Sequence, residues 1–86
     1  EGVGMQRKYI SAVKPLEEYI LQVDFNSGSR LLLDIKPYLD RMRFCALKNP
    51  RVWQSAVTNG IFVRFGDVEI SHDELLQMAE EGQRAI

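Results

Sequence analysis

Residues 56–65 read Ala-Val-Thr-Asn-Gly-Ile-Phe-Val-Arg-Phe, and this is the most informative stretch of the sequence. Asn-Gly between two β-rich runs is typical of a two-residue type I′ turn, because both central residues of that turn need a positive φ. In that register the paired residues are Thr58–Ile61, Val57–Phe62 and Ala56–Val63. Val57 and Phe62 then lie on the face opposite Val63 and Phe65, so the predicted sheet carries apolar side chains on both faces.

A second hairpin is predicted at residues 19–35, where two alternating runs flank an Asn-Ser-Gly turn. The alternation places Leu21 and Leu33 on one face and Ile20 and Leu32 on the other. Apolar residues on a second face indicate that a helix or another chain covers it, and in so small a chain we favour a second copy or a different protein. The candidate interface residues are therefore Ile20, Leu32, Val57 and Phe62.

Short helices and a C-terminal helix complete the prediction. A strand is expected at 9–13 and a helical turn at 36–40, and Asn49 before Pro50 indicates a short helix that buries Trp53. Residues 71–74 read Ser-His-Asp-Glu, a capping box that begins the C-terminal helix. Its apolar stripe is Leu75, Leu76, Met78 and Ala79, and Gly82 is expected to end it. The predicted class is α+β, with a small, mostly antiparallel sheet built from two hairpins.

Length and composition indicate one domain, residues 5–86, preceded by four residues that are either vector-derived or the native start. The 45% hydrophobic content and net charge of −1 describe a folded protein rather than a disordered one. No apolar run approaches the ~20 residues of a membrane span. The single cysteine, Cys45, cannot form an intramolecular disulfide and fits a reducing compartment, so we expect a cytoplasmic protein.

Residues that suggest catalytic chemistry have simpler structural explanations. Ser71, His72 and Asp73 are consecutive at a helix start, where side chains diverge, so a cap is favoured over a nucleophilic triad. His72 is the only histidine, and the sequence implies no partner for it. Cys45 is flanked by Phe44 and Ala46, which favours a buried, inert thiol. We therefore expect no catalytic residue, metal or cofactor; a weak cation site at Asp67 and Glu69 is the less favoured alternative to a solvated edge.

The charges are segregated along the chain. Residues 41–66 contain no acidic residue and five basic ones: Arg41, Arg43, Lys48, Arg51 and Arg64. Together with Phe44 and Trp53 they resemble the interleaved pattern of single-strand binders. Both aromatics are needed in the core, however, and the sequence pI of about 5.8 is low for a nucleic-acid-binding protein. We expect these charges to face solvent or to be neutralised by the acidic residues at 67–83.

The order of these signals resembles the bacterial family known as domain of unknown function 2442. The resemblance rests on residues 13–16 and 19–25 with Gly28, on residues 44–50 with Trp53, and on residues 60–65 and 67–75. Members often have Trp where this chain has Phe65, and many have Pro where it has His72. The resemblance implies an α+β domain. Some members lie beside a predicted toxin-like partner, and no catalytic residue can be carried over.

We therefore expect a non-catalytic, cytoplasmic protein-interaction module, antitoxin-like or accessory in role, that binds a protein partner or a second copy of itself. The alternative is a nucleic-acid-binding or transcription-associated accessory domain that uses the basic segment at 41–66. No membrane partner is expected.

Overall fold

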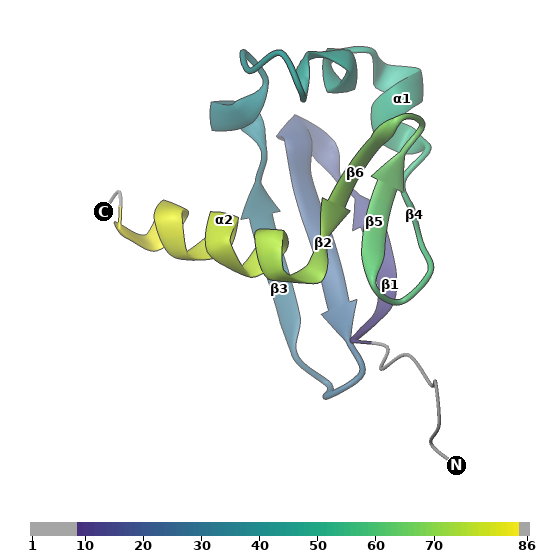
Figure 1. Cartoon of the computed structure of the whole chain (residues 1–86), viewed down its shortest axis with the longest axis vertical. Helices are drawn as coiled ribbons and strands as arrows, with labels where there is room; N and C mark the ends of the chain where they lie inside the picture. Colours follow the sequence, from purple (N-terminus) through teal and green to yellow (C-terminus); the bar gives the residue numbers. More distant parts are fainter. Residues whose placement is uncertain (1–8, 85–86) are drawn as a thin grey trace.

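The computed structural model of the chain describes residues 9–84. It is an α+β fold with two three-stranded antiparallel sheets (Figure 1). The first sheet has the order β1-β2-β3, with β1 at Ile10–Pro15, β2 at Ile20–Phe25 and β3 at Arg30–Asp34. The second has the order β4-β5-β6, with β4 at Val57–Thr58, β5 at Phe62–Phe65 and β6 at Val68–Ser71. Residues 1–4, which the sequence analysis left as either vector-derived or native, lie outside the described residues.

Helical segments connect the sheets and cover them. Three 3₁₀ turns, η1 (Glu17–Tyr19), η2 (Lys36–Tyr38) and η3 (Cys45–Lys48), precede or follow the strands. Helix α1 (Pro50–Gln54) begins where the sequence predicts, because the Asn49 side chain accepts a hydrogen bond from the Arg51 N–H. In Figure 1, η3 and α1 cap one end of the sheets, while α2 (His72–Arg84) crosses in front of β2 and β3.

One hydrophobic cluster joins the two sheets and the helices. The inner face of the first sheet contributes Leu21 and Leu33, as the alternation predicts, and β5 contributes Val63 and Phe65. Trp53 of α1 stacks on the Phe65 ring with centroids 5.3 Å apart. Its indole N–H donates to the carbonyl of Leu16 at 3.1 Å, which satisfies the polar end of this buried ring.

The predicted two-residue turn at 59–60 is wrong, although the hairpin is present. Thr58 pairs with Val63, so four residues, 59–62, lie between the paired residues, and among these four only Gly60 has a positive φ. The Asn59 side chain accepts hydrogen bonds from the N–H groups of Ile61 and Phe62, both at 2.9 Å, which stabilises the wider loop. A shift of two residues preserves the predicted faces, because side chains alternate with period two.

Several other local predictions are also wrong. β1 continues through Pro15, which pairs with Leu21 at the sheet edge, where its missing N–H does no harm. Helix α2 does not stop at Gly82 but continues to Arg84. Leu76, assigned to the apolar stripe, is 46% exposed, because the core contacts fall on Leu75 and Met78. Cys45 is exposed instead of buried, since it is the first residue of η3 and the buried residue of that turn is Leu47.

Candidate functional site: an aromatic groove at the start of helix α2

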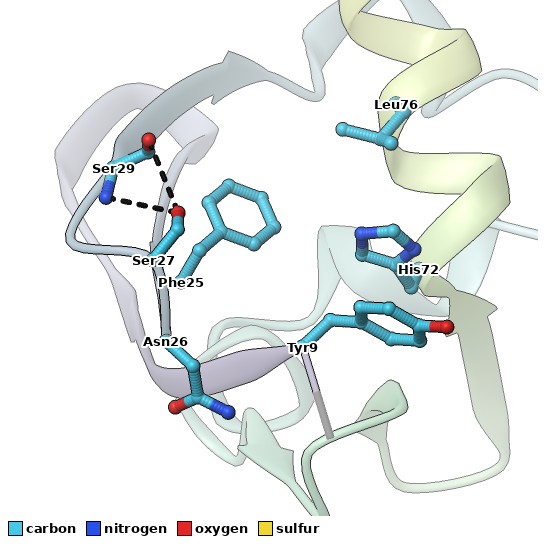
Figure 2. A pocket seen from close by; sticks show the side chains of 7 residues that line it. All are labelled: Tyr9, Phe25, Asn26, Ser27, Ser29, His72 and Leu76. Atoms are coloured by element: carbon cyan, nitrogen blue, oxygen red, sulfur yellow. Dashed lines mark hydrogen bonds between the residues drawn. The ribbon is translucent and has the colours of Figure 1, made fainter. Parts of the chain in front are cut away.

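An open groove of about 500 Å³ lies where the end of β2 meets the start of α2 (Figure 2). Its walls are the rings of Tyr9, Phe25 and His72 together with Leu76. The residues of the β2–β3 turn, Asn26, Ser27 and Ser29, form a polar rim. None of these seven lining residues is acidic or carries a Lys or Arg side chain.

The central feature of the groove is a stack of two rings. Tyr9 and His72 lie face to face with centroids 4.2 Å apart and ring planes 15° from parallel. The Phe25 ring lies edge-on to the His72 ring, with centroids 5.9 Å apart. Nδ1 of His72 lies 3.3 Å from a carboxylate oxygen of the exposed Asp73. His72 is thus held on two sides, and its side chain is only 18% exposed.

The loop at 59–62 holds the two stacked residues together. The Gly60 carbonyl accepts hydrogen bonds from the backbone N–H groups of Tyr9 and Ile10, at 2.8 and 2.9 Å. The next carbonyl, that of Ile61, accepts the N–H of His72 at 3.0 Å. The loop of the second hairpin therefore places both rings, since its adjacent carbonyls bind the backbone at the start of β1 and at the start of α2.

The capping box and an ion pair fix the direction of α2. The Glu74 N–H donates to the Ser71 hydroxyl at 3.1 Å, as the capping motif predicts. The guanidinium of Arg43 binds both carboxylate oxygens of Glu74 and donates to the Glu69 carbonyl at 2.5 Å. Arg43 holds the pKa of Glu74 below its ordinary value against the opposing effect of burial, and the backbone of Ser71 adds to the lowering.

The four candidate interface residues do not form one surface. Leu32 is 60% exposed on the outer face of the first sheet, with Ile20 half-buried on the same face. Val57 and Phe62 are exposed on the outer face of the second sheet. The core cluster lies between the two sheets, so these faces form two separate surfaces.

The candidate basic patch is largely neutralised within the fold. Arg43 binds Glu74, Lys48 lies 3.3 Å from Asp40, and Arg64 lies 3.7 Å from Glu69. The guanidinium carbon of Arg41 lies 4.8 Å from the centroid of the Tyr38 ring in a cation–π contact. Arg51 contributes a backbone hydrogen bond to the cap of α1. Most of these cations therefore have a structural contact.

Other candidates for chemistry stay apart in the fold. The exposed Cys45 thiol donates to the Met42 carbonyl at 3.2 Å. Among residues 9–81, no three His, Cys, Asp or Glu side chains come close enough together to hold a metal ion. No helix in the described part of the chain is long and apolar enough to cross a membrane.

The groove is the feature that the sequence analysis missed. Its residues were assigned to a strand, a turn and a helix cap, and their convergence is a property of the tertiary fold. One signal was available: His72 and Leu76 are four residues apart and must share one side of a helix. The structure shows Leu76 exposed beside His72 on this helix face, and such a pair indicates a candidate binding surface.

Comparison with known proteins finds a family but no described relative. The chain matches the family described as protein of unknown function (DUF2442) over residues 10–81, which is most of its length. Neither curated proteins nor solved structures provide a match. The matched range includes both sheets and most of α2. The chain therefore belongs to the DUF2442 family.

Proposed function

We propose that this domain is a non-catalytic protein-interaction module whose aromatic groove receives an apolar side chain of a partner protein. The observation that carries the proposal is the composition of the groove. Its walls are aromatic and aliphatic, its rim is polar, and its lining contains no carboxylate or Lys/Arg head group. Protein-binding surfaces combine an apolar centre and a polar rim in this way.

The groove is continuous with the hydrophobic core, which favours an apolar occupant. Phe25 packs against the core cluster on one side and lines the groove on the other. Tyr9 and Leu76 remain 40% and 46% exposed. Full burial of an exposed aliphatic or aromatic side chain is worth about 1.5–3 kcal/mol, so a residue inserted from a partner would gain up to this amount and would extend the core at this open end.

The nucleic-acid alternative has less support. Three of the five basic residues form ion pairs with acidic side chains, so phosphate binding would have to compete with these contacts. The two alternatives differ in salt dependence. Binding to phosphates weakens steeply as salt rises, whereas apolar association does not. The antitoxin-like role and the cytoplasmic location stay predictions.

A matched pair of variants tests the groove. Leu76→Glu places a charge at its wall, and Gln77→Glu places the same charge at the next, exposed position of α2. We expect the wild-type chain and Gln77→Glu to capture the same partner from the native host, and Leu76→Glu to lose it. Direct titration of the purified partner should then show at least a tenfold weaker affinity for Leu76→Glu. Equal binding by all three proteins would contradict a role for the groove.

A further inference from the structure

The edge strand β3 is unprotected, in contrast to the other edge of the same sheet. β1 has a register irregularity between Ile10 and Ala12, ends at Pro15 and lies against β4, where the Gly60 carbonyl accepts the N–H groups of Tyr9 and Ile10, so this edge is not open to another strand. β3 is five residues long, pairs with β2 in an unbroken register and contains no proline. Its middle residue, Leu32, is 60% exposed. In Figure 1 no other strand lies beside its outer edge.

The hydrogen-bonding pattern shows which backbone groups of β3 point outward. The N–H of Ile35 donates to the Tyr19 carbonyl, and the N–H of Phe25 donates to the Ser29 carbonyl. In an antiparallel pair, hydrogen-bonded residues alternate with residues whose backbone groups point away. The backbone groups that point toward β2 are therefore those of residues 29, 31, 33 and 35. Those of Arg30, Leu32 and Asp34 point to the free edge.

The sequence of this edge is self-complementary. β3 reads Arg-Leu-Leu-Leu-Asp, with opposite charges at its two ends and leucine between them. When two copies pair antiparallel about Leu32, Arg30 of each lies opposite Asp34 of the other. Leu32 then lies opposite its own copy, and all three outward-pointing residues form hydrogen-bonded pairs. Each of the three pairs exchanges two backbone hydrogen bonds, which gives six in all. A pairing register shifted by two residues in either direction would lose two of these bonds and would separate Arg30 from Asp34.

From this match we propose that β3 pairs with β3 of a second copy of the chain, and so joins two three-stranded sheets into one of six strands. The paired charges extend contacts that already exist in one copy. Nε of Arg30 lies 2.7 Å from Oδ1 of Asp24, and Nζ of Lys36 lies 3.1 Å from Oδ1 of Asp34. The dimer therefore aligns four charges of alternating sign across its outer face. None of the residues that line the aromatic groove belongs to β3, and the inference does not depend on the proposed function.

The position of helix α2 restricts how the two copies can approach each other. The two-fold axis passes through Leu32 perpendicular to the joined sheet, so both copies of α2 lie on one face. The hydroxyl of Tyr38, which follows β3, donates to Glu81 at 3.0 Å and lies 3.4 Å from the Met78 carbonyl. These contacts tie the later turns of α2 to the segment that follows Asp34, and in Figure 1 those turns extend past the outer edge of β3. In the dimer, the later turns of each α2 therefore lie over the partner's sheet on the shared face.

Disulfide trapping tests the register directly. Hydrogen-bonded antiparallel residues have Cα atoms about 5.5 Å apart, a separation that a disulfide spans. In a Cys45→Ser background, Leu32→Cys should form a covalent dimer of twice the 9.9 kDa chain mass under mild oxidation. Val57→Cys is the matched control, because Val57 is 55% exposed on the other sheet. We expect at least tenfold more dimer from Leu32→Cys, and equal yields would overturn the proposal.

Sedimentation equilibrium provides the second measurement. A pairing of this size buries less than a standard interface, so we expect a weak dimer that is populated between about 10 µM and 1 mM. The wild-type chain and Val57→Lys should gain mass over this range, and Leu32→Lys should remain monomeric. A monomeric wild-type chain throughout, or a Leu32→Lys variant that still dimerises, would overturn the proposal. If Leu32→Lys fails to fold by circular dichroism, the trapping experiment decides alone.

Discussion

Replacing Glu74 with glutamine should destabilise the domain by about 1 kcal/mol at neutral pH. The substitution keeps the size and helix propensity of the side chain but removes the charge that Arg43 binds with both ends of its guanidinium. The side chains of Arg43 and Glu74 are 51% and 29% exposed, so solvent screens the pair and its value stays near that of a good surface ion pair. Loss of a negative charge from the first turn of α2 adds a few tenths of a kcal/mol.

The pH dependence has a definite sign. Because Arg43 lowers the pKa of Glu74 in the folded state, the stabilisation is complete above the ordinary carboxyl pKa and is lost as the pH falls through the lowered value. Thermal unfolding followed by circular dichroism should show Glu74→Gln melting about 4–8 °C below wild type at neutral pH. The difference should shrink as the pH falls from about 5 to about 3.

Glu69→Gln is the matched control for this experiment. Its carboxylate lies 3.7 Å from Arg64 and is 52% exposed, so we expect a change below about 0.5 kcal/mol. A Glu74→Gln variant that melts with wild type at neutral pH would show that the Arg43–Glu74 ion pair does not stabilise the domain. So would a difference that persists unchanged in acid, because the charge could not then be its source.

Three further predictions concern the elements around the groove. Gly60→Ala should destabilise the fold by about 1–3 kcal/mol, because Gly60 has a φ of 99°; an unchanged urea midpoint would contradict this. Ser71→Ala should cost about 0.5–2 kcal/mol through loss of the cap while leaving partner affinity unchanged at a temperature where the domain is folded, and a loss of affinity there would give Ser71 a binding role. Cys45 should react with a thiol reagent under native conditions nearly as fast as an unstructured peptide, since it is exposed; labelling only after denaturation would contradict its position.

The local elements could be predicted because their signals depend on neighbouring residues. The alternation in β2 and β3 fixed their inner faces, and the Asn49 and Ser71 caps marked the starts of α1 and α2. The loop at 59–62 could not be predicted, because its shape depends on distant partners. Hydrogen bonds from Tyr9 and His72 to its carbonyls favour the wider loop over a type I′ turn.

The groove could not be predicted for the same reason. It forms where the start of β1, the end of β2 and the start of α2 meet, and each contributes a ring that the sequence presents as an ordinary strand or cap residue. Cys45 shows the opposite error. Its apolar neighbours indicated burial, but residues in a tight turn alternate irregularly between core and solvent, and only Phe44 and Leu47 of this segment point inward.

NMR mapping of the partner's contact surface on this domain tests most directly whether the groove is the binding site. Titration of that partner into the ¹⁵N-labelled domain should shift the amide signals of Ser27, Ser29 and His72 together with that of Leu76, because these residues surround the groove. Shifts confined to Val57 and Phe62 on the second sheet, or to Arg51 in the basic segment, would contradict the claim that the groove is the binding site.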